Sequence, residues 1–526
     1  MNTKQNENRV ANIYLLLTAF SILTAVFYIF SSGISGNDFW WHTKAGEWMV
    51  NNRSLPGIDP FSWYAQEKNL VWASHEWLAQ ILIHLVHRAG GSPGIFIFSL
   101  SAAWLMILLI IARNRISINR NLVFGTIFLS ASIPLFAGFF CGRPQTFSYF
   151  LIFATLHCLY DLKNNENSKI VLLTPFFAIL WANLHAGSSS LSYILCFTFF
   201  FSGLADFSWG RLKAEKHTPR QARIYLITGM LTIAGLTVNP YGLEMVLHPY
   251  VNINDHFLQM MINEWNPPDA KIIIQVLFFF FPMFLAAIAL MLSEKPIKLI
   301  DLLLFVLFSY MFFRSRRFSI LLMLAASFFV FDYPPEKQPE QFSQNRKPLP
   351  LFPGIVFTCI LLLTINLLNI TKTLKTFQRG ELVSVALDSE FIDFIKTRAP
   401  KRLFNDFNYG ETLIYRDIKT FADARADLFS PHNLRDMLSL LKLTQTDGSQ
   451  REKSLDPQKL IEKYDFDAFL LRTGWSLANY LRSRPDEYRI LKETEETVYF
   501  ERVTETSSDK PAGRGKLNSL SQQTSL

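Results

Sequence analysis

The sequence predicts an all-α polytopic membrane domain followed by a small α/β domain. Half of its 526 residues are hydrophobic, and 49 of them are Phe. The apolar residues gather in about eleven runs of roughly 20 residues, the length that a helix needs to cross a bilayer. Beyond the last run, short segments alternate between strand-like and helix-like patterns, which is typical of a small mixed domain.

The first run, "ANIYLLLTAFSILTAVFYIFSS", has no small-residue cleavage site and is too long for a signal-peptide core, so we expect it to be retained. We place the spans at approximately 11–32, 92–113, 121–141, 145–161, 169–186, 189–207, 222–239, 272–292, 298–313, 317–332 and 350–370. The formal charge of +8 comes from Lys and Arg scattered over the short links, so we expect no nucleic-acid partner.

The basic residues of the links predict the orientation. With the N-terminus in the cytoplasm, the positive-inside rule is obeyed, and the opposite orientation inverts it. The inner links then hold Arg113, Arg115, Arg120, Lys163, Lys169, Arg211, Lys213, Lys216, Arg220, Lys295, Lys298, Lys337, Arg346 and Lys347. We therefore expect the loops 33–91 and 239–269, and everything after residue 371, on the outer side.

The chain thus divides into a membrane domain (1–371), an extracytoplasmic α/β domain (372–503) and a disordered polar tail (504–526). Within the first outer loop, "HEWLAQILIHLVHRAG" has helical apolar spacing but is short, so we expect it to lie along the interface or to re-enter it. In the α/β domain, "RLFNDF", "TFADARADLF", "DAFLLR" and "RILKETEETVYFERV" read as strands. The segments "SEFIDFIKTR" and "WSLANYLRSRP" read as helices.

Unusual ionisable residues collect in the outer links, at one predicted depth. They are Asp38, His42, His75, Glu76, Arg143, His185, Glu244, His248, Glu264, Arg314, Arg316 and Arg317. Ionisable groups near a bilayer are costly, so such a collection indicates a functional site. A transporter typically places such groups near the midplane, often on broken helices.

The arginine cluster in "FFRSRRF" runs against the positive-inside bias. One interpretation is a helix end whose arginines extend to the interface. The other is an anion site formed by Arg314, Arg316 and Arg317, with Arg143 of "CGRPQ" as a further member. Guanidinium groups suit phosphate oxygens, and a phosphate at a membrane surface belongs to a lipid headgroup or a lipid-linked substrate.

Asp38 opens the segment "DFWWHTKAGEW" and has two interpretations. As the N-cap of a helix, its carboxylate would accept from the first free N–H groups. As a general base, it would take a proton from an acceptor hydroxyl. His42 would share its helical face, and the small side chains of Ala45 and Gly46 would permit close packing. His75 and Glu76 would orient the base or help to hold a divalent ion, and a structural salt bridge for Glu76 is equally compatible.

Other candidates keep two interpretations as well. The tryptophans of the first outer loop, Trp40, Trp41, Trp48, Trp63, Trp72 and Trp77, suit either interface anchoring or the face of a sugar. His185 and Asn183 suit either capping and interhelical hydrogen bonds or substrate contact. In "ADARAD", Asp423, Arg425 and Asp427 suit either a surface ion-pair ladder on a strand or recognition of the acceptor.

The motifs "NDFWWHTKAGEW", "DPFSW", "HEWL", "GRPQTFS", "WANLHAG", "NPYG", "NEW", "RSRRF" and "FADARADLF" resemble, in this order, those of a bacterial family of GT-C-like membrane proteins. With the large first outer loop and the outer C-terminal domain, they also resemble the GT-C superfamily of integral-membrane glycosyltransferases. The resemblance covers most of residues 35–430. It implies a bacterial cytoplasmic-membrane enzyme that uses a polyprenyl-phosphate-linked sugar and a glycan, lipid or protein acceptor.

The resemblance also implies residue roles. The superfamily carries its catalytic acidic residue in the first outer loop, which Asp38 matches, with His42 and Glu76 beside it. Phe39 stands where a neighbouring acidic residue is common, so a divalent cation such as Mg²⁺ or Mn²⁺ would need Glu76 as its second carboxylate. The arginines would bind the donor phosphate. Trp40, Trp41, His75, His185 and Glu264 would contact the substrates.

Two functions of other classes compete with glycosyl transfer. A transporter or lipid flippase would show inverted repeats and charges at the midplane, where Asp301 and Asn366 are isolated candidates. A non-catalytic component of an envelope polysaccharide system would tolerate replacement of Asp38 and would keep Asp38 far from the arginine turn.

Overall fold

The computed structural model describes residues 38–120, 122–254, 262–333, 387, 389–446 and 452–503. The expected spans 11–32 and 350–370, Asn366 and the expected disordered tail 504–526 lie outside these residues. The chain forms two compact units. The helical unit comprises the described residues up to 387 together with Asn408–His432, and the sheet unit comprises Ser389–Phe407 and the residues from Asn433 onward.

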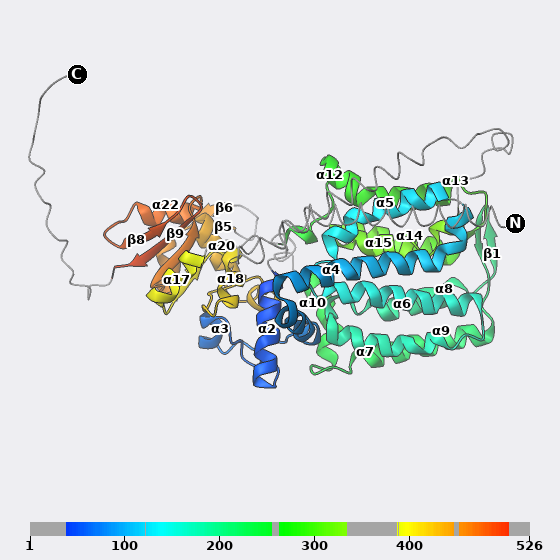
Figure 1. Ribbon diagram of the computed structural model, residues 1–526, viewed down its shortest axis with the longest axis horizontal. Coiled ribbons are helices and arrows are strands. Elements are labelled where there is room, and N and C mark those ends of the chain that lie inside the picture. Colours follow the sequence, from blue (N-terminus) through cyan, green and yellow to red (C-terminus); the bar gives the residue numbers. More distant parts are fainter. Residues whose placement is uncertain are drawn as a thin grey trace, which may run out of the picture. The chain divides into compact units, whose positions relative to one another are not determined.

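The helical unit is a bundle in which helices far apart in the sequence run side by side (Figure 1). Its helices are α2 (Asp38–Asn52), α3 (Trp63–Glu67), α4 (Trp77–Arg120), α5 (Leu122–Phe139), α6 (Gln145–Asn164), α7 (Thr174–Leu184), α8 (Leu191–Ser202), α9 (Pro219–Leu236), α10 (Leu243–Asn254), α12 (Ile273–Gln275), α13 (Phe281–Leu292), α14 (Leu299–Arg314), α15 (Ser319–Ala326), α18 (Gly410–Tyr415) and α19 (Ala426–Phe429). Short 3₁₀ or π turns lie at η1 (Ile170–Leu173), η2 (Ala186–Ser188), η3 (Asn263–Trp265), η4 (Val276–Phe280), η5 (Arg316–Phe318) and η6 (Val330–Asp332).

Each expected span within the described residues coincides with helical structure, which confirms the mainly helical class. By length and composition, one helix among the described residues, Trp77–Arg115, is long and apolar enough to cross a membrane. Shorter apolar helices lie at Ile170–Leu184, Ala186–Ser202 and Phe281–Leu292. The expected number of about eleven spans is therefore not established by these helices.

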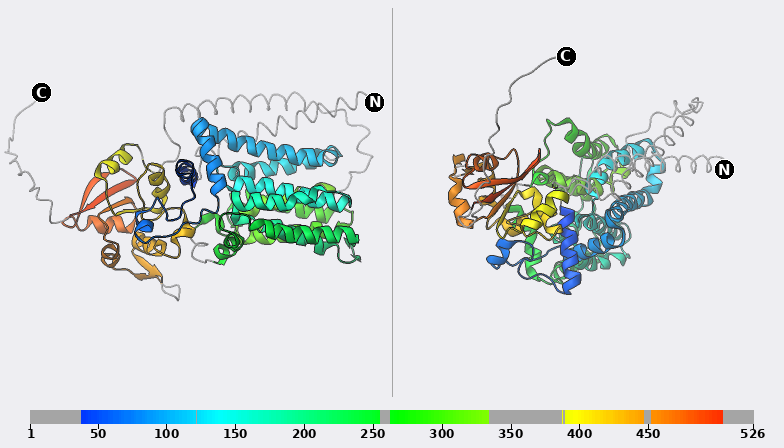
Figure 2. Two further views of the ribbon diagram at one scale, coloured as in Figure 1. Left: turned by 90° about the horizontal axis from the view of Figure 1, so that it is seen from below. Right: turned by 60° about the vertical axis from the view of Figure 1, so that its left-hand side comes forward.

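Helix α4 joins the expected short helix of the first outer loop to the next expected span. The two parts meet at Gly91, whose φ of 59° and ψ of −155° are not helical. Positive φ is strained for residues with a Cβ and is readily adopted by glycine. Pro93 follows, and its ring fixes φ at a value suited to the first turn of a helix. The two parts of α4 consequently run in different directions (Figure 2).

A three-stranded sheet of order β1-β2-β3 lies at the end of the bundle opposite α2 (Figure 1). Its strands are β1 (Phe207–Trp209), β2 (Leu212–Ala214) and β3 (Ile297–Lys298). Strand β2 is antiparallel to β1 and parallel to β3. The guanidinium of Arg211 donates to the carbonyls of Leu290, Met291 and Lys295, so one side chain ties the sheet to the end of α13.

The sheet unit contains a four-stranded sheet of order β4-β7-β9-β8, with β4 parallel to β7 and the other neighbours antiparallel. Its strands are β4 (Leu403–Asn405), β7 (Ala468–Arg472), β8 (Tyr488–Glu493) and β9 (Thr497–Arg502), and a separate pair is formed by β5 (Thr444–Thr446) and β6 (Glu452–Ser454). Its helices are α17 (Ser389–Arg398), α20 (Leu434–Lys442), α21 (Pro457–Tyr464) and α22 (Ser476–Arg482). These elements match the expected α/β pattern of the tail, except in one segment.

That exception is "TFADARADLF". The segment is irregular up to Arg425 and then forms α19, so the expectation of a strand is wrong, and residues 408–432 belong to the helical unit. Arg425 is 1% exposed. Its guanidinium donates to both oxygens of Asp423 and of Asp59 and lies 4.7 Å from the ring of Trp72. The expected surface ladder is instead a buried ion network that ties this segment to the first loop.

We predict that Arg425→Ala destabilises the protein by about 3–5 kcal/mol, because removing one partner leaves buried carboxylates without compensation. The measurement is the thermal unfolding midpoint of the purified protein. Arg88→Ala, which removes an exposed arginine of α4, serves as the control and should leave the midpoint unchanged. Equal midpoints for the two variants would show that the network does not stabilise the fold.

Candidate functional site

Most of the outer-link residues predicted from the sequence lie together at the α2 end of the bundle. Helix α2 reaches this place because it packs tightly against α4: a Cβ at Gly46 would lie 2.1 Å from the carbonyl oxygen of Gln80. The close packing expected from Ala45 and Gly46 is therefore confirmed for Gly46. It fixes the start of α2, with Asp38 in its first turn, against the start of α4.

Arg143 links two carboxylates from distant segments. Its guanidinium donates to Asp38 and, at 2.9 Å, to Oε1 of Glu264. The Asp38 side chain is 25% exposed and that of Glu264 45% exposed, so both carboxylates remain accessible. Burial alone would raise the pKa of Glu264, but Arg143 and Arg317 outweigh it and hold this pKa below its usual range. Glu264 is thus an ionised carboxylate at neutral pH.

The arginine turn lies beside this pair. The Ser315 hydroxyl donates to the Glu264 carbonyl at 2.9 Å, and the Arg316 amide donates to the Asn266 carbonyl at 3.0 Å, which fixes η5 against η3. Arg317 lies 5.5 Å from the ring of Trp265. Among the described residues, Arg314, Arg316 and Arg317 form no ion pair with a carboxylate. Their charges are available to an anion.

Glu76 is buried near these groups and is surrounded by histidines. Its carboxyl oxygens lie 3.7 Å from Nδ1 of His42, 3.8 Å from Nε2 of His75 and 3.4 Å from Nε2 of His185. Burial, with smaller contributions from Asp427 and Asp38, raises the pKa of Glu76 to about 8 against the opposing effects of Arg143 and Arg317. The carboxyl is therefore protonated at neutral pH.

The three histidines are neutral as well. Burial holds the pKa of His42, His75 and His185 well below the usual range, and nearby cations add to it: Arg143 acts on His42, and Arg317 acts on the other two. The contacts with Glu76 are thus between neutral groups rather than ion pairs. Ser148 and Ser188 orient the ring of His185 through contacts of 2.7 and 3.0 Å at Nδ1.

Several candidates have structural roles in this arrangement. Trp40 and Trp41 are 5% and 7% exposed, and their rings pack against protein neighbours such as Tyr415 and Trp72. We therefore leave them out of the proposed substrate site. Asn183 accepts from the indole of Trp77 and donates to two backbone carbonyls, which confirms the interhelical hydrogen-bond role.

Two carboxyl groups at this end were not singled out by sequence reasoning. Glu411 on α18 is 4% exposed, and burial holds its pKa well above the usual range, with Asp38 and Asp423 adding to the shift. Asp59 is buried against Arg425. Both follow from contacts between the first loop and residues 408–432, and no pattern within either segment reveals such a contact.

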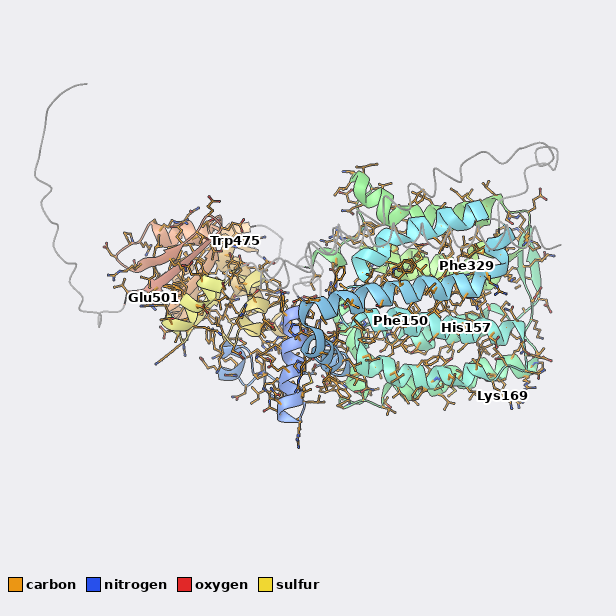
Figure 3. The ribbon with its side chains drawn as sticks, in the orientation of Figure 1. Phe150, His157, Lys169, Phe329, Trp475 and Glu501 are labelled. Atoms are coloured by element: carbon orange, nitrogen blue, oxygen red, sulfur yellow. The ribbon has the colours of Figure 1, made fainter. Side chains whose placement is uncertain are left out.

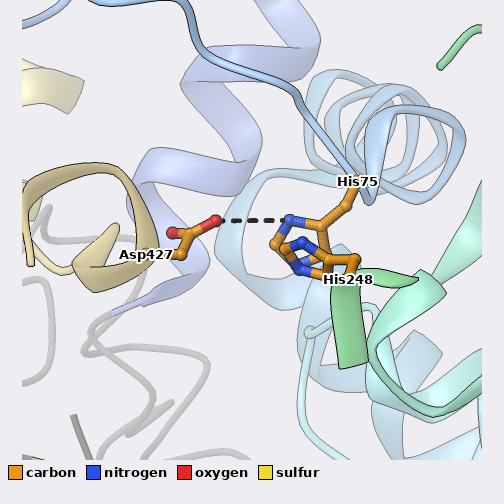
Figure 4. Close-up of side chains that lie close together, drawn as sticks. All are labelled: His75, His248 and Asp427. Carbon is orange, nitrogen blue, oxygen red and sulfur yellow. Dashed lines mark ion pairs between the residues drawn. The ribbon is translucent and has the colours of Figure 1, made fainter. Parts of the chain in front are cut away.

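A possible metal group lies next to Glu76. Among the described residues, His75, His248 and Asp427 offer ligand atoms within 4.8 Å of one another, and Asp38 and Glu76 are not in this group. Figure 4 shows Asp427 approaching the ring of His75 at 3.5 Å, with the ring of His248 beside it. Two imidazoles and one carboxylate suit Zn²⁺. Mg²⁺ prefers oxygen ligands, so this set does not fit it.

The comparison with solved structures bears on the fold. The chain is similar to the archaeal oligosaccharyltransferase AglB from Archaeoglobus fulgidus, solved in complex with an inhibitory peptide and a dolichol-phosphate. The TM-score is 0.51 at 12% sequence identity, over 88% of this chain and 70% of that one. The two chains thus share a similar fold. No family model and no curated protein matches the sequence.

We predict that the stability of Glu76→Gln relative to the wild type increases as the pH rises. Below a pH of about 4.3, Glu76 is protonated in the folded and unfolded chain alike. Between that pH and about 8, the unfolded chain releases the proton while the folded chain keeps it, so the wild type loses stability relative to Glu76→Gln as the pH rises. The buried histidines are common to both proteins and cancel from this difference. The loss is on the order of 5 kcal/mol across this window. Unfolding midpoints at pH 5 to 8, measured with a chelator present, report it.

The control for this measurement is Glu67→Gln, which removes an exposed carboxyl of α3 and should keep the wild-type slope. A Glu76→Gln variant with the wild-type slope would mean that Glu76 is ionised in the folded protein.

We predict that chelator-treated protein retains Zn²⁺ but not Mg²⁺ in equilibrium dialysis, because the donor set of His75, His248 and Asp427 is rich in nitrogen. His248→Ala should remove the retained ion, whereas His432→Ala, which removes an exposed histidine, should not. Retention of neither ion, or retention by His248→Ala, would exclude this group as a metal site.

Proposed function

We propose that the protein transfers a sugar from a polyprenyl-phosphate donor to an acceptor at the α2 end of the bundle. The observation that carries this proposal is the contact of Arg143 with Asp38 and Glu264, directly beside arginines that have no carboxylate partner. A carboxylate that accepts a proton and cations that receive a phosphate are the two groups that such a transfer needs. The GT-C-like fold supports the same chemistry, since AglB is an oligosaccharyltransferase.

In the proposed mechanism, the acceptor hydroxyl oxygen attacks the anomeric carbon on the face opposite the phosphate. The bond from the anomeric carbon to the phosphate oxygen breaks, and the hydroxyl proton passes to the Asp38 carboxylate. Polyprenyl phosphate leaves with one more negative charge, which Arg317 and its neighbours Arg314 and Arg316 stabilise. The product has the inverted configuration.

Arg143 acts as a positioning residue in this proposal, in place of the phosphate-binding role expected from the sequence. Its guanidinium already compensates two carboxylates, whereas Arg317 has no such partner. Arg143 therefore holds Asp38 in place, and Arg317 meets the phosphate. The neutral Glu76 and histidines beneath add no competing charge. These neutral side chains pack against one another next to the site. His75, His185 and Glu264 remain the candidates for substrate contact.

The proposed orientation follows the positive-inside count, with this end of the bundle outside a bacterial cytoplasmic membrane. A transporter is less well supported. Asp301, its candidate for a midplane charge, is held by the hydroxyls of Tyr160 and Tyr333 at 2.7 Å, next to the β1-β2-β3 sheet. A scaffold without catalysis would not need Asp38 and the arginine turn in one place.

We predict that Asp38→Asn and Arg317→Ala each lower the transfer rate by about 10²–10³, as expected for the loss of preorganised charge stabilisation. The measurement is sugar transfer in reconstituted membranes with labelled polyprenyl-phosphate sugars. Arg220→Ala, at the other end of the bundle, controls for the loss of a basic residue and should keep the wild-type rate. Full transfer by Asp38→Asn would refute the proposed base.

A further inference from the structure

A cavity of about 460 Å³ lies at the end of the bundle away from Asp38. Strands β2 and β3, the last turn of α6, the start of α14 and the Asp332–Tyr333 turn line it. Figure 1 shows β1, of the same sheet, at the end of the helices opposite α2. The volume lies within the range of about 300–1,000 Å³ that is usual for small-ligand pockets.

The cavity is basic. Lys163, Lys213, Lys295 and Lys298 line it together with two carboxylates, Glu215 and Asp332, which leaves a net charge of +2. Asp332 is paired with two of these lysines. Its carboxylate lies 3.2 Å from Nζ of Lys298, and its backbone carbonyl accepts a hydrogen bond from Nζ of Lys295 at 2.8 Å. Among the described residues, neither Lys163 nor Lys213 forms an ion pair. These two lysines thus have no carboxylate at ion-pair distance, although Asp301 and Glu215 attract Lys163 from farther away.

Two of these lysines stand directly opposite each other in the sheet. Strands β2 and β3 are parallel, and Lys213 is the register partner of Lys298. Like charges in directly opposite positions destabilise a sheet. The backbone holds them there, because the Ile297 amide donates to the Arg211 carbonyl at 2.7 Å while the Arg211 side chain is bound to three carbonyls. An anion between the lysines would remove this repulsion.

We propose that this cavity binds a phosphate group, carried by an anionic lipid headgroup or by a soluble phosphate. Ammonium groups act on phosphate as compact point charges, and several can surround one group without a fixed mutual geometry. Basic pockets between membrane helices are suited to phospholipid headgroups. The site shares no residue with the proposed transfer site.

The test uses the full-length protein purified in detergent. Binding of phosphatidylglycerol, which carries an anionic headgroup, is measured by native mass spectrometry with phosphatidylcholine as the lipid of zero net charge. Binding of labelled inorganic phosphate is measured by equilibrium dialysis. The variant is Lys163→Gln with Lys213→Gln, because removing these two lysines leaves no carboxylate without its partner.

We expect the double variant to bind phosphatidylglycerol or inorganic phosphate about 30-fold more weakly, since each lysine contributes about fivefold. Lys169→Gln is the matched control: Lys169 is exposed at the same end of the bundle (Figure 3) and does not line the cavity. It should bind as the wild type does. The single variants should each lose about fivefold, which separates loss of charge from loss of fold.

Loss of phosphatidylglycerol binding alone would support the site and identify a lipid as the source of the phosphate. Loss of inorganic phosphate binding alone would support it with a soluble source. The proposal is overturned if neither anion binds, if phosphatidylcholine binds as well as phosphatidylglycerol, or if the double variant and Lys169→Gln bind equally. Asp38→Asn should bind both anions as the wild type does, so the result does not depend on glycosyl transfer.

Discussion

The double contact of Arg143 is the interaction on which the candidate site depends. Its guanidinium joins the start of α2 to η3, and η3 is in turn bound to the arginine turn of η5. Arg143 thereby holds three distant segments together. More than a hundred residues separate Asp38 from Arg143, and as many separate Arg143 from Glu264. Arg143 and Arg317 both act on Glu264, and among the described residues Arg314, Arg316 and Arg317 form no ion pair with a carboxylate.

The neutral layer beneath this point has a physical cause. Arg143 and Arg317 disfavour imidazolium ions, and burial disfavours every ionised form, so Glu76 and three histidines are uncharged together. A low-dielectric layer beneath charged groups strengthens their action on a substrate, since less solvent screens them.

The lengths of the apolar runs predicted most of the long helices of the described bundle, and strand-like and helix-like patterns predicted most of the sheet unit. These patterns are local, and burial enforces them directly. The place of Asp38, Arg143, Glu264 and Arg317 at one end followed from counting basic residues in the links. The buried network of Arg425 was not predictable in this way, because its partner Asp59 lies in a distant loop. The sequence "ADARAD" is compatible with an exposed strand and with a buried ion cluster. The contacts of Arg425 with Trp72 and Asp59, which lie in the first loop, favour the buried cluster.

The turn at Gly91 places one half of α4 in the bundle and the other half across its end. His75 and Glu76 immediately precede the half that crosses the end of the bundle, so the torsion angles of Gly91, together with the packing of α2 against α4, set the position of the Glu76 carboxyl. A change of a few degrees at Gly91 would be multiplied along the helix into a displacement of Glu76. The direction of the first half of α4 therefore depends on a backbone conformation at Gly91 that only glycine adopts without strain.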